Sequence, residues 1–194
     1  EYSAMFEVPI LDHCEDCHLA DGGVMHEGFY STKLGLKGIP ALAESTQVAR
    51  DVELAAFTGG HIHVMHVSKA QSLEHIRHGK ARGVRVTCEV TPHHFVLTDE
   101  MLAAPVPYDT NAKMNPPLRT AEDIAAVRAG VADGTIEVIA SDHAPHHIDE
   151  KHVEVLGRRA ESPRRAVVAA FPEAERDLVE LAKTLPFVDF VRAV

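Results

Sequence analysis

The 194-residue sequence lacks several features that mark common classes of protein. Its three cysteines, Cys14, Cys17 and Cys88, are odd in number and too few for a secreted disulfide framework. There is no apolar run of 18 residues and no recognisable signal peptide, so we expect neither a membrane-spanning helix nor export. Together these absences make a reducing cytoplasm the expected compartment.

Positive charge is also scarce. The chain has 19 lysines and arginines against 29 aspartates and glutamates, which gives a formal net charge of −10. Nucleic acids and anionic membranes are bound through clustered basic side chains, and the sequence shows no such stripe. We therefore expect neither as a partner. A dinucleotide site also has no support, because no G-x-G-x-x-G follows the first predicted strand.

What is present is a globular composition, 45% hydrophobic, that changes character near residue 155. Residues 1–154 contain all 14 histidines and carry 12 basic and 23 acidic side chains, whereas residues 155–194 carry 7 and 6. We therefore treat 155–194 as a separate tail, either a divergent domain or the product of a shifted reading frame. Leu178, Leu181 and Leu185 recur there at helical spacing, so we expect the tail to be partly helical.

Within residues 1–154, apolar β-rich runs alternate with helical ones, which is a βα repeat. Near-continuous apolar strands separated by helices predict a parallel sheet covered by helices, either a (β/α) barrel or an open doubly wound sheet. The runs are FEVPILDH, ESTQVARDVELAAF, HIHVMHV, SLEHIRHGKARG, VRVTCEV, TAEDIAAVRAG and IEVIASD.

Local signals predict where these helices begin and end. Ser68 with Gln71 forms a capping-box pattern, and Thr120 with Asp123 forms a looser version of it. Four glycines are expected to mark helix ends: Gly79, Gly83, Gly130 and Gly134.

Polar residues recur where the predicted strands end, which is where active sites of parallel barrels lie. Imidazole and carboxylate groups converging from successive strands are suitable ligands for zinc, at about 2.0 to 2.2 Å. A metal-dependent hydrolase is therefore the first hypothesis. The residues concerned are His13, His66, Glu89, His93, His94 and Asp142.

Other interpretations of these histidines have to be considered. A single histidine at a strand end is more often a hydrogen-bonded structural residue than a ligand. HCEDCH, residues 13–18, resembles half of a Cys/His zinc knuckle, but no second cysteine-containing ligand pair lies at a suitable spacing. In a regular strand, His61 and His63 would share one face and His66 the other, so the three cannot all bind one metal.

Five segments, in order and spacing, resemble the dihydroorotases of the cyclic amidohydrolase superfamily, and together they cover roughly residues 1–154. They are LDHCED, HIHVMHVSKAQSLEHI, VTCEVTPHHFVLTDE, NAKMNPPLR and IASDHAPHHIDEK. The resemblance implies a (β/α)8 TIM-type barrel with one or two zinc ions. It also implies the zinc-dependent, reversible cyclisation of N-carbamoyl-L-aspartate to dihydroorotate in de novo pyrimidine biosynthesis.

The resemblance also implies roles for particular residues. His13 and His66 are similar to two histidine ligands of the metal centre, and Asp142 to the carboxylate that contacts the metal and acts as general acid and base. Asn115 and His146 are similar to groups that hold the substrate.

Other residues in these segments have less direct roles by resemblance. Arg119 is a weaker candidate for contact with a substrate carboxylate. Four further histidines belong to the family segments without an assured chemical role, and we interpret them as structural or as orienting the ligands. They are His93, His94, His143 and His147.

The sequence also departs from the family pattern. The His-x-His pair of the first barrel strand and the carboxylate or modified lysine that bridges the metals are not in it. About four βα units are visible where a complete barrel has eight. We therefore expect residues 1–154 to be the C-terminal half of an amidohydrolase barrel, inactive without the other half.

Two alternatives remain open. One is another cyclic amidohydrolase, such as a dihydropyrimidinase, hydantoinase or allantoinase. The other is a non-catalytic dihydroorotase-like subunit that scaffolds aspartate transcarbamoylase, although His13, His66 and Asp142 are all kept. The expected partners are a small-molecule substrate, with a homodimer or an aspartate transcarbamoylase complex as further possibilities.

Overall fold

The structure is a computed structural model that describes residues 1–143. The predictions made for His146, His147 and the tail at 155–194 lie outside the described residues, as does the proposed boundary at residue 154.

A four-stranded parallel sheet forms the centre of the described fold. Its order, β1-β4-β5-β6, follows the chain, and every neighbouring pair is parallel. In register, Leu11 lies beside His63 and Val64 beside Cys88. The strands are β1 (Pro9–Asp12), β4 (His61–Val64), β5 (Val86–Val90) and β6 (Val138–Ile139). The predicted βα repeat is confirmed.

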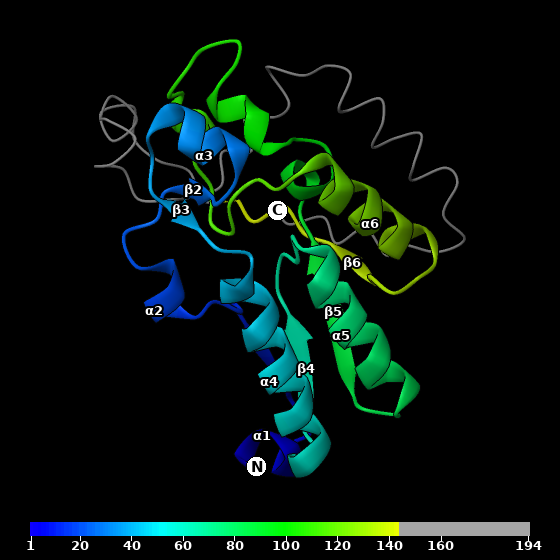
Figure 1. Cartoon of the computed structure of the whole chain (residues 1–194). Coiled ribbons are helices and arrows are strands. Elements are labelled where there is room, and N and C mark those ends of the chain that lie inside the picture. Colours follow the sequence, from blue (N-terminus) through cyan, green and yellow to red (C-terminus); the bar gives the residue numbers. More distant parts are fainter. Residues whose placement is uncertain (144–194) are drawn as a thin grey trace.

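Three helices cover one face of this sheet and lie side by side along it (Figure 1). They are α4 (Leu42–Thr58), α5 (Ala70–Ala81) and α6 (Ala121–Ala132). The main core lies between the helices and the sheet, where Val48, Leu73 and Val127 pack with Val64 and Val90. Alternate residues of β5 point away from the helices, so Thr87 and Glu89 lie on the other face, with His61 and His63 of β4.

Additional elements lie beyond the carboxyl ends of the strands (Figure 1). Between β1 and α4 come α2 (Cys17–Ala20), β2 (Met25–His26), α3 (Phe29–Leu34) and β3 (Gly38–Ile39), with β2 and β3 paired in parallel. Three 3-10 helices follow β5, namely η1 (Pro92–Phe95), η2 (Asp99–Leu102) and η3 (Thr110–Ala112). A second core of Met25, Leu97, Leu102, Met114 and Leu118 joins the two insertions. The short helix α1 (Tyr2–Met5) precedes β1.

The predicted helix boundaries are partly right. Thr120 caps α6, because its side-chain oxygen accepts a hydrogen bond from the backbone N–H of Asp123. The capping box predicted at Ser68 is wrong: α5 begins after Lys69, and the Ser68 hydroxyl instead donates to Glu44. At the start of α5, the backbone N–H of Ala70 has no partner within the helix and instead donates to the Asp123 carboxylate of α6.

The glycine predictions divide in the same way. Gly83 and Gly134 follow α5 and α6 with φ angles of 77° and 76°, a conformation that glycine adopts without strain. Gly79 and Gly130 lie inside the two helices, so the prediction that they mark helix ends is wrong.

The described residues contain about four βα units in parallel order, as expected for part of a (β/α) barrel. Among the helices of residues 1–143, none combines the length and apolar character needed to cross a bilayer.

Candidate metal and substrate site

The carboxyl ends of the parallel strands bring the two predicted histidine ligands together. His13 directly follows β1, and His66 lies two residues beyond β4. His13 Nδ1 and His66 Nε2 are 2.9 Å apart, and the rings meet edge to face with their centroids at 4.6 Å. His66 is buried and His13 is exposed, so one ring is enclosed by the protein and the other is accessible to solvent.

Unusual backbone conformations place two of the site residues. His66 has a φ angle of 34° and Asp142 one of 45°, the left-handed region that residues other than glycine seldom enter. Such residues concentrate at functional sites, where surrounding contacts hold them. Here the N–H groups of Met65 and Val67, on either side of His66, donate to the carbonyls of Asp12 and Glu89.

The backbone turn at His66 separates this residue from His61 and His63, the two histidines of β4. His61 and His63 instead contact the Thr87 hydroxyl at 2.9 and 2.8 Å, and His63 lies 3.2 Å from a Glu89 oxygen. The prediction that His61, His63 and His66 do not share one metal therefore agrees with the structure.

Asn115 reaches the same site from a distant part of the chain. Its side-chain Nδ2 lies 3.3 Å from His13 Nε2. Two buried atoms here, Asn115 Oδ1 and His66 Nδ1, have no hydrogen-bond partner among the described residues. Buried polar atoms are normally satisfied, so the arrangement has capacity for a further group.

The charges around the site favour different forms of the two imidazoles. The Glu15 carboxylate, 3.9 Å from His13 Nε2, raises the pKa of His13, and the charges of Asp12 and Asp142 add to this effect. Burial lowers the pKa of His66, and the neighbouring His13 lowers it further. His66 is therefore held as the neutral imidazole, which is the form that binds metals.

These residues fit a divalent cation. Two ligands of one tetrahedral zinc ion, each at 2.0 to 2.1 Å, lie about 3.3 Å apart. The 2.9 Å separation of His13 Nδ1 and His66 Nε2 is close to that value. The charge of Asp142 contributes to raising the pKa of both histidines, although in the described residues its carboxylate does not lie within 4.8 Å of both ring nitrogens.

The structure places Arg119 differently from the prediction. Its side chain is 2% exposed, and its three nitrogens contact Ser68, His26 and Glu44. Its guanidinium is therefore committed to protein partners, and the prediction that it contacts a substrate carboxylate is wrong.

His93 and His94 have the structural role predicted for them. His94 Nε2 donates to the Pro116 carbonyl at 2.8 Å, and Thr91 Oγ1 lies 2.7 Å from His94 Nδ1 and 2.9 Å from His93 Nε2. Burial lowers the pKa of both rings, that of His94 to about 3. Both are neutral, and His94 ties the Asn115 loop to the end of β5. His143 is exposed.

The Cys/His segment does not form a zinc knuckle. The Cys14 thiol is buried and lies 3.3 Å from Asp12 Oδ2 and 3.6 Å from Asp51 Oδ2, whereas Cys17 is exposed at the start of α2. The ligand atoms of Asp12, Cys14 and Asp51 lie within 4.8 Å of one another, close enough to hold a cation. Their hydrogen bonds to one another already account for the arrangement.

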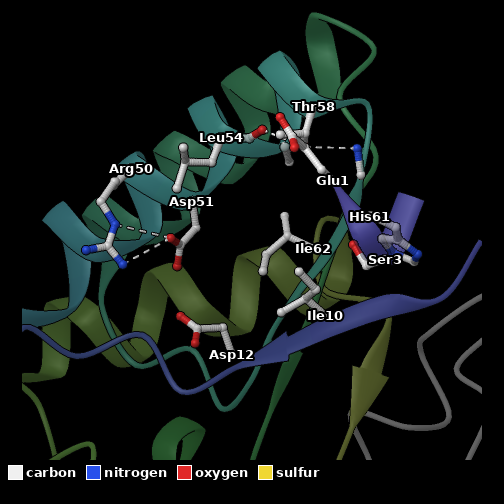
Figure 2. A pocket seen from close by; sticks show the side chains of 12 residues that line it. Glu1, Ser3, Ile10, Asp12, Arg50, Asp51, Leu54, Thr58, His61 and Ile62 are labelled. Carbon is white, nitrogen blue, oxygen red and sulfur yellow. Dashed lines mark hydrogen bonds and ion pairs between the residues drawn. The ribbon is translucent and has the colours of Figure 1, made fainter. Parts of the chain in front are cut away.

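Asp12 and Asp51 also line a hollow of about 330 Å³ between β1 and α4, away from His13 and His66. Figure 2 shows Arg50 paired with Asp51 on one side, and Ile10 and Ile62 below. Burial, with Asp12 nearby, raises the pKa of Asp51 to about 6. The hollow lies in the layer between sheet and helix, so it is separate from the histidine site.

Sequence reasoning missed the buried acid Glu44, which accepts hydrogen bonds from the loop after His66. A signal for it exists in the sequence. Glu44 precedes Val48 and Val52 at intervals of four, so it lies on the apolar face of its helix. A charged residue on such a face needs a buried partner.

The sequence matches known proteins over most of its length. A family model described as dihydro-orotase-like matches residues 2–72. Dihydroorotases from Pelobacter propionicus and Pelotomaculum thermopropionicum are 58% and 61% identical over 154 residues, which is 79% of this chain. The chain belongs to the dihydroorotase family. It spans 36% and 35% of the length of these two relatives.

Solved structures share the fold of this dihydroorotase family member. D-hydantoinase (dihydropyrimidinase) from Thermus sp. superimposes with a TM-score of 0.70 at 22% identity, over 89% of this chain and 40% of that one. Dihydropyrimidinase from Brevibacillus agri gives 0.70 at 18% identity, over 88% and 40%. At this level of identity the likeness establishes the barrel fold alone.

Proposed function

We propose that this chain is the part of a dihydroorotase that carries two metal-binding histidines, the general acid and base, and a substrate-orienting amide. The observation that carries the proposal is the meeting of His13, His66 and Asn115 at the strand ends in a chain 56–61% identical to proteins named dihydroorotase. The reaction is the reversible cyclisation of N-carbamoyl-L-aspartate to dihydroorotate, a step of pyrimidine biosynthesis. Because the chain spans about a third of its relatives, the activity belongs to a completed barrel.

His13, His66 and Asp142 would hold the metal, for which we propose zinc. A zinc ion there would lower the pKa of water and polarise a carbonyl oxygen. The neutral form of His66 and the exposure of His13 suit this role, since one ring is fixed in the protein and the other faces the site. Asn115 Nδ2, next to His13, would donate to the substrate, and its unpartnered Oδ1 would accept from it. We assign His146 to the substrate as well.

Asp142 would move the proton. Hydrolysis of the ring amide needs a base that takes a proton from water and then returns it to the departing nitrogen, and one carboxylate can do both in turn. In the cyclisation direction the same carboxylate works in reverse, as an acid first. Its position beyond β6, where its charge acts on both histidines, supports this role.

The alternatives predict different chemistry or none. Solved hydantoinases and dihydropyrimidinases share the fold, so a cyclic ureide other than dihydroorotate is the second candidate substrate. A non-catalytic subunit that scaffolds aspartate transcarbamoylase is less well supported, because the histidine pair is intact. We propose the reducing cytoplasm as the compartment, which the three free cysteines support.

A chimera would test the proposal. The matching 154-residue segment of the Pelobacter propionicus dihydroorotase is replaced by its counterpart from this chain, and turnover is measured on dihydroorotate, hydantoin and dihydrouracil. Dihydroorotate should be the preferred substrate. Preference for either of the other two would favour the second candidate, and a folded chimera inactive on all three would favour the scaffold.

A further inference from the structure

A buried ion pair joins the two loops that carry the proposed site residues. We propose that Glu44 and Arg119 are positioning residues that fix His66 and Asn115 relative to each other, an inference that rests on the proposed function. Neither side chain is itself exposed in the site: Glu44 is 4% and Arg119 2% exposed. They act on the site indirectly, because Glu44 holds the backbone that follows His66 and Arg119 belongs to the loop that carries Asn115.

Glu44 anchors the chain that follows His66. Its carboxylate accepts hydrogen bonds from the backbone N–H groups of Ser68 and Lys69, at 3.1 and 3.0 Å, and from the Ser68 hydroxyl. It also accepts from the Ser72 hydroxyl in the first turn of α5 at 2.7 Å. Ser68 lies only two residues beyond His66, whose left-handed backbone must be held by its surroundings.

Arg119 anchors the loop of Asn115 to the same carboxylate. Its Nη2 contacts Glu44 at 3.2 Å, its Nε donates to the Ser68 hydroxyl at 2.9 Å, and its Nη1 lies 3.1 Å from His26 Nδ1. The planar guanidinium presents donors in fixed directions, so it sets an orientation as well as a distance. Between Asn115 and Arg119, Pro116 and Pro117 restrict the backbone, so a displaced Arg119 shifts the Asn115 side chain.

Stability alone does not account for a pair of this kind. A buried ion pair can often be replaced by apolar side chains at no cost, since desolvation offsets the attraction of the charges. The pair joins the two segments that carry His66 and Asn115. The Glu44 carboxylate binds the backbone after His66, and it also binds Arg119, which lies in the Asn115 loop. Its geometry therefore serves alignment of the site.

The test compares two neutralised ion pairs in the complete 194-residue chain. The test variant combines Glu44→Gln with Arg119→Met, so that no buried charge is left without its partner. The matched control combines Glu137→Gln with Lys80→Met and removes a pair that joins α5 to the start of β6, at the opposite end of the strands. The measurements are the nuclear Overhauser contact between the Asn115 side-chain amide and the His13 ring, and zinc affinity by competition with a chelator.

The test variant should lose the Asn115–His13 contact and bind zinc 10- to 100-fold more weakly, the usual effect of removing residues that orient metal ligands. The control should keep both properties. A folded test variant that retains the contact and the control's zinc affinity overturns the proposal.

Two further outcomes are also informative. If the double variant does not fold, Arg119→Lys keeps the charge but cannot contact Ser68, His26 and Glu44 together, and it should weaken the same contact; an unchanged contact there overturns the proposal. If the unsubstituted chain binds zinc too weakly for the competition, the Asn115–His13 contact alone decides the positioning role, and the proposed function is decided separately by the chimera.

Discussion

At the scale of single residues, Asp142 is the side chain on which the proposed chemistry depends most. Asp142→Asn keeps the shape of the side chain and removes its ability to accept a proton. In the chimera, we expect this change to lower the rate in both directions by about 10²- to 10⁴-fold, the range for general acid and base groups. Zinc content, measured by metal analysis, should stay close to that of the parent. Near-normal rates in either direction would limit Asp142 to a ligand role.

The same proton transfer predicts how the rates depend on pH. Hydrolysis requires the carboxylate form of Asp142 and cyclisation requires the acid form, so the two directions should have opposite pH profiles. Initial rates measured from dihydroorotate and from N-carbamoyl-L-aspartate over one pH series will show this. Parallel profiles would be inconsistent with a single shuttling group.

His94 illustrates a structural residue with a measurable effect on stability. Its pKa is lowered to about 3 in the folded chain by burial, against 6.5 in the unfolded chain. Between these values the unfolded state binds a proton that the folded state does not, so stability is complete above pH 6.5 and is lost as the pH falls. Each such histidine contributes a slope of about 1.4 kcal/mol per pH unit.

His94→Gln retains a donor for the Pro116 carbonyl and removes the titration. The free energy of unfolding, measured with urea between pH 4.5 and 6.5, should therefore depend less steeply on pH in this variant, by about one proton. Asp51 and Asp99, whose raised pKa values act in the opposite sense, are common to both chains and cancel in the comparison. An unchanged slope would show that His94 is not held neutral.

At the scale of helices and strands, α5 packs tightly against α4 at Gly79. A Cβ placed there would lie 2.7 Å from Cγ1 of Val52, a short and stiff side chain, so Gly79→Ala should destabilise the fold by about 1–3 kcal/mol. Gly130 is the matched control in α6, because its added Cβ would meet the movable ends of Leu73 and Ile136 at 3.2 Å. There the gain in helix propensity, about 1 kcal/mol, should offset the crowding. Urea unfolding of both variants gives the comparison, and equal effects would contradict this view of the packing.

The regular elements were predictable because their patterns are long. The runs that became α4, α5 and α6 contain enough turns to show an apolar face, and β4 and β5 alternate with a period of two. The elements β2 and β3, of two residues each, are too short to leave such a pattern. The cap at Ser68 was mispredicted because Glu44, 24 residues away, binds its hydroxyl, and no local pattern contains that contact.

In the candidate site, too, features with a local sequence pattern were predictable, and features set by contacts between distant residues were not. The meeting of His13 and His66 was predictable from their places after strands, since parallel strands end at one edge. Arg119 was not, because its burial depends on two insertions whose packing is set by tertiary contacts. His26 and Glu44, which bind it, come from different parts of the chain.

At the scale of the whole molecule, the described sheet has two edges, at β1 and β6. Apolar side chains along the β1 edge are exposed, including Val8, Ile10 and Leu11. Unpaired strand edges of this kind favour association with another chain. We propose that the rest of a barrel covers them in the active protein, and that the 194-residue chain alone binds zinc weakly and does not turn over dihydroorotate.

The change in composition near residue 155 leads to a prediction about the tail. We propose that residues 155–194 do not belong to the catalytic core, because their charge balance differs and the family resemblance ends before them. Removing them should leave the amide spectrum of residues 1–143 unchanged. Limited proteolysis of the complete chain provides a second measurement, and a tail as resistant to cleavage as the βα core would contradict the prediction.

The most direct test of the central claim is the rate of dihydroorotate hydrolysis by the chimera, measured beside the 194-residue chain alone. The claim is that this segment supplies His13, His66, Asn115 and Asp142 to a dihydroorotase site. The chimera should turn over dihydroorotate at a rate comparable to the parent enzyme, and the chain alone should show none. A folded, zinc-loaded chimera without activity on dihydroorotate would contradict the account.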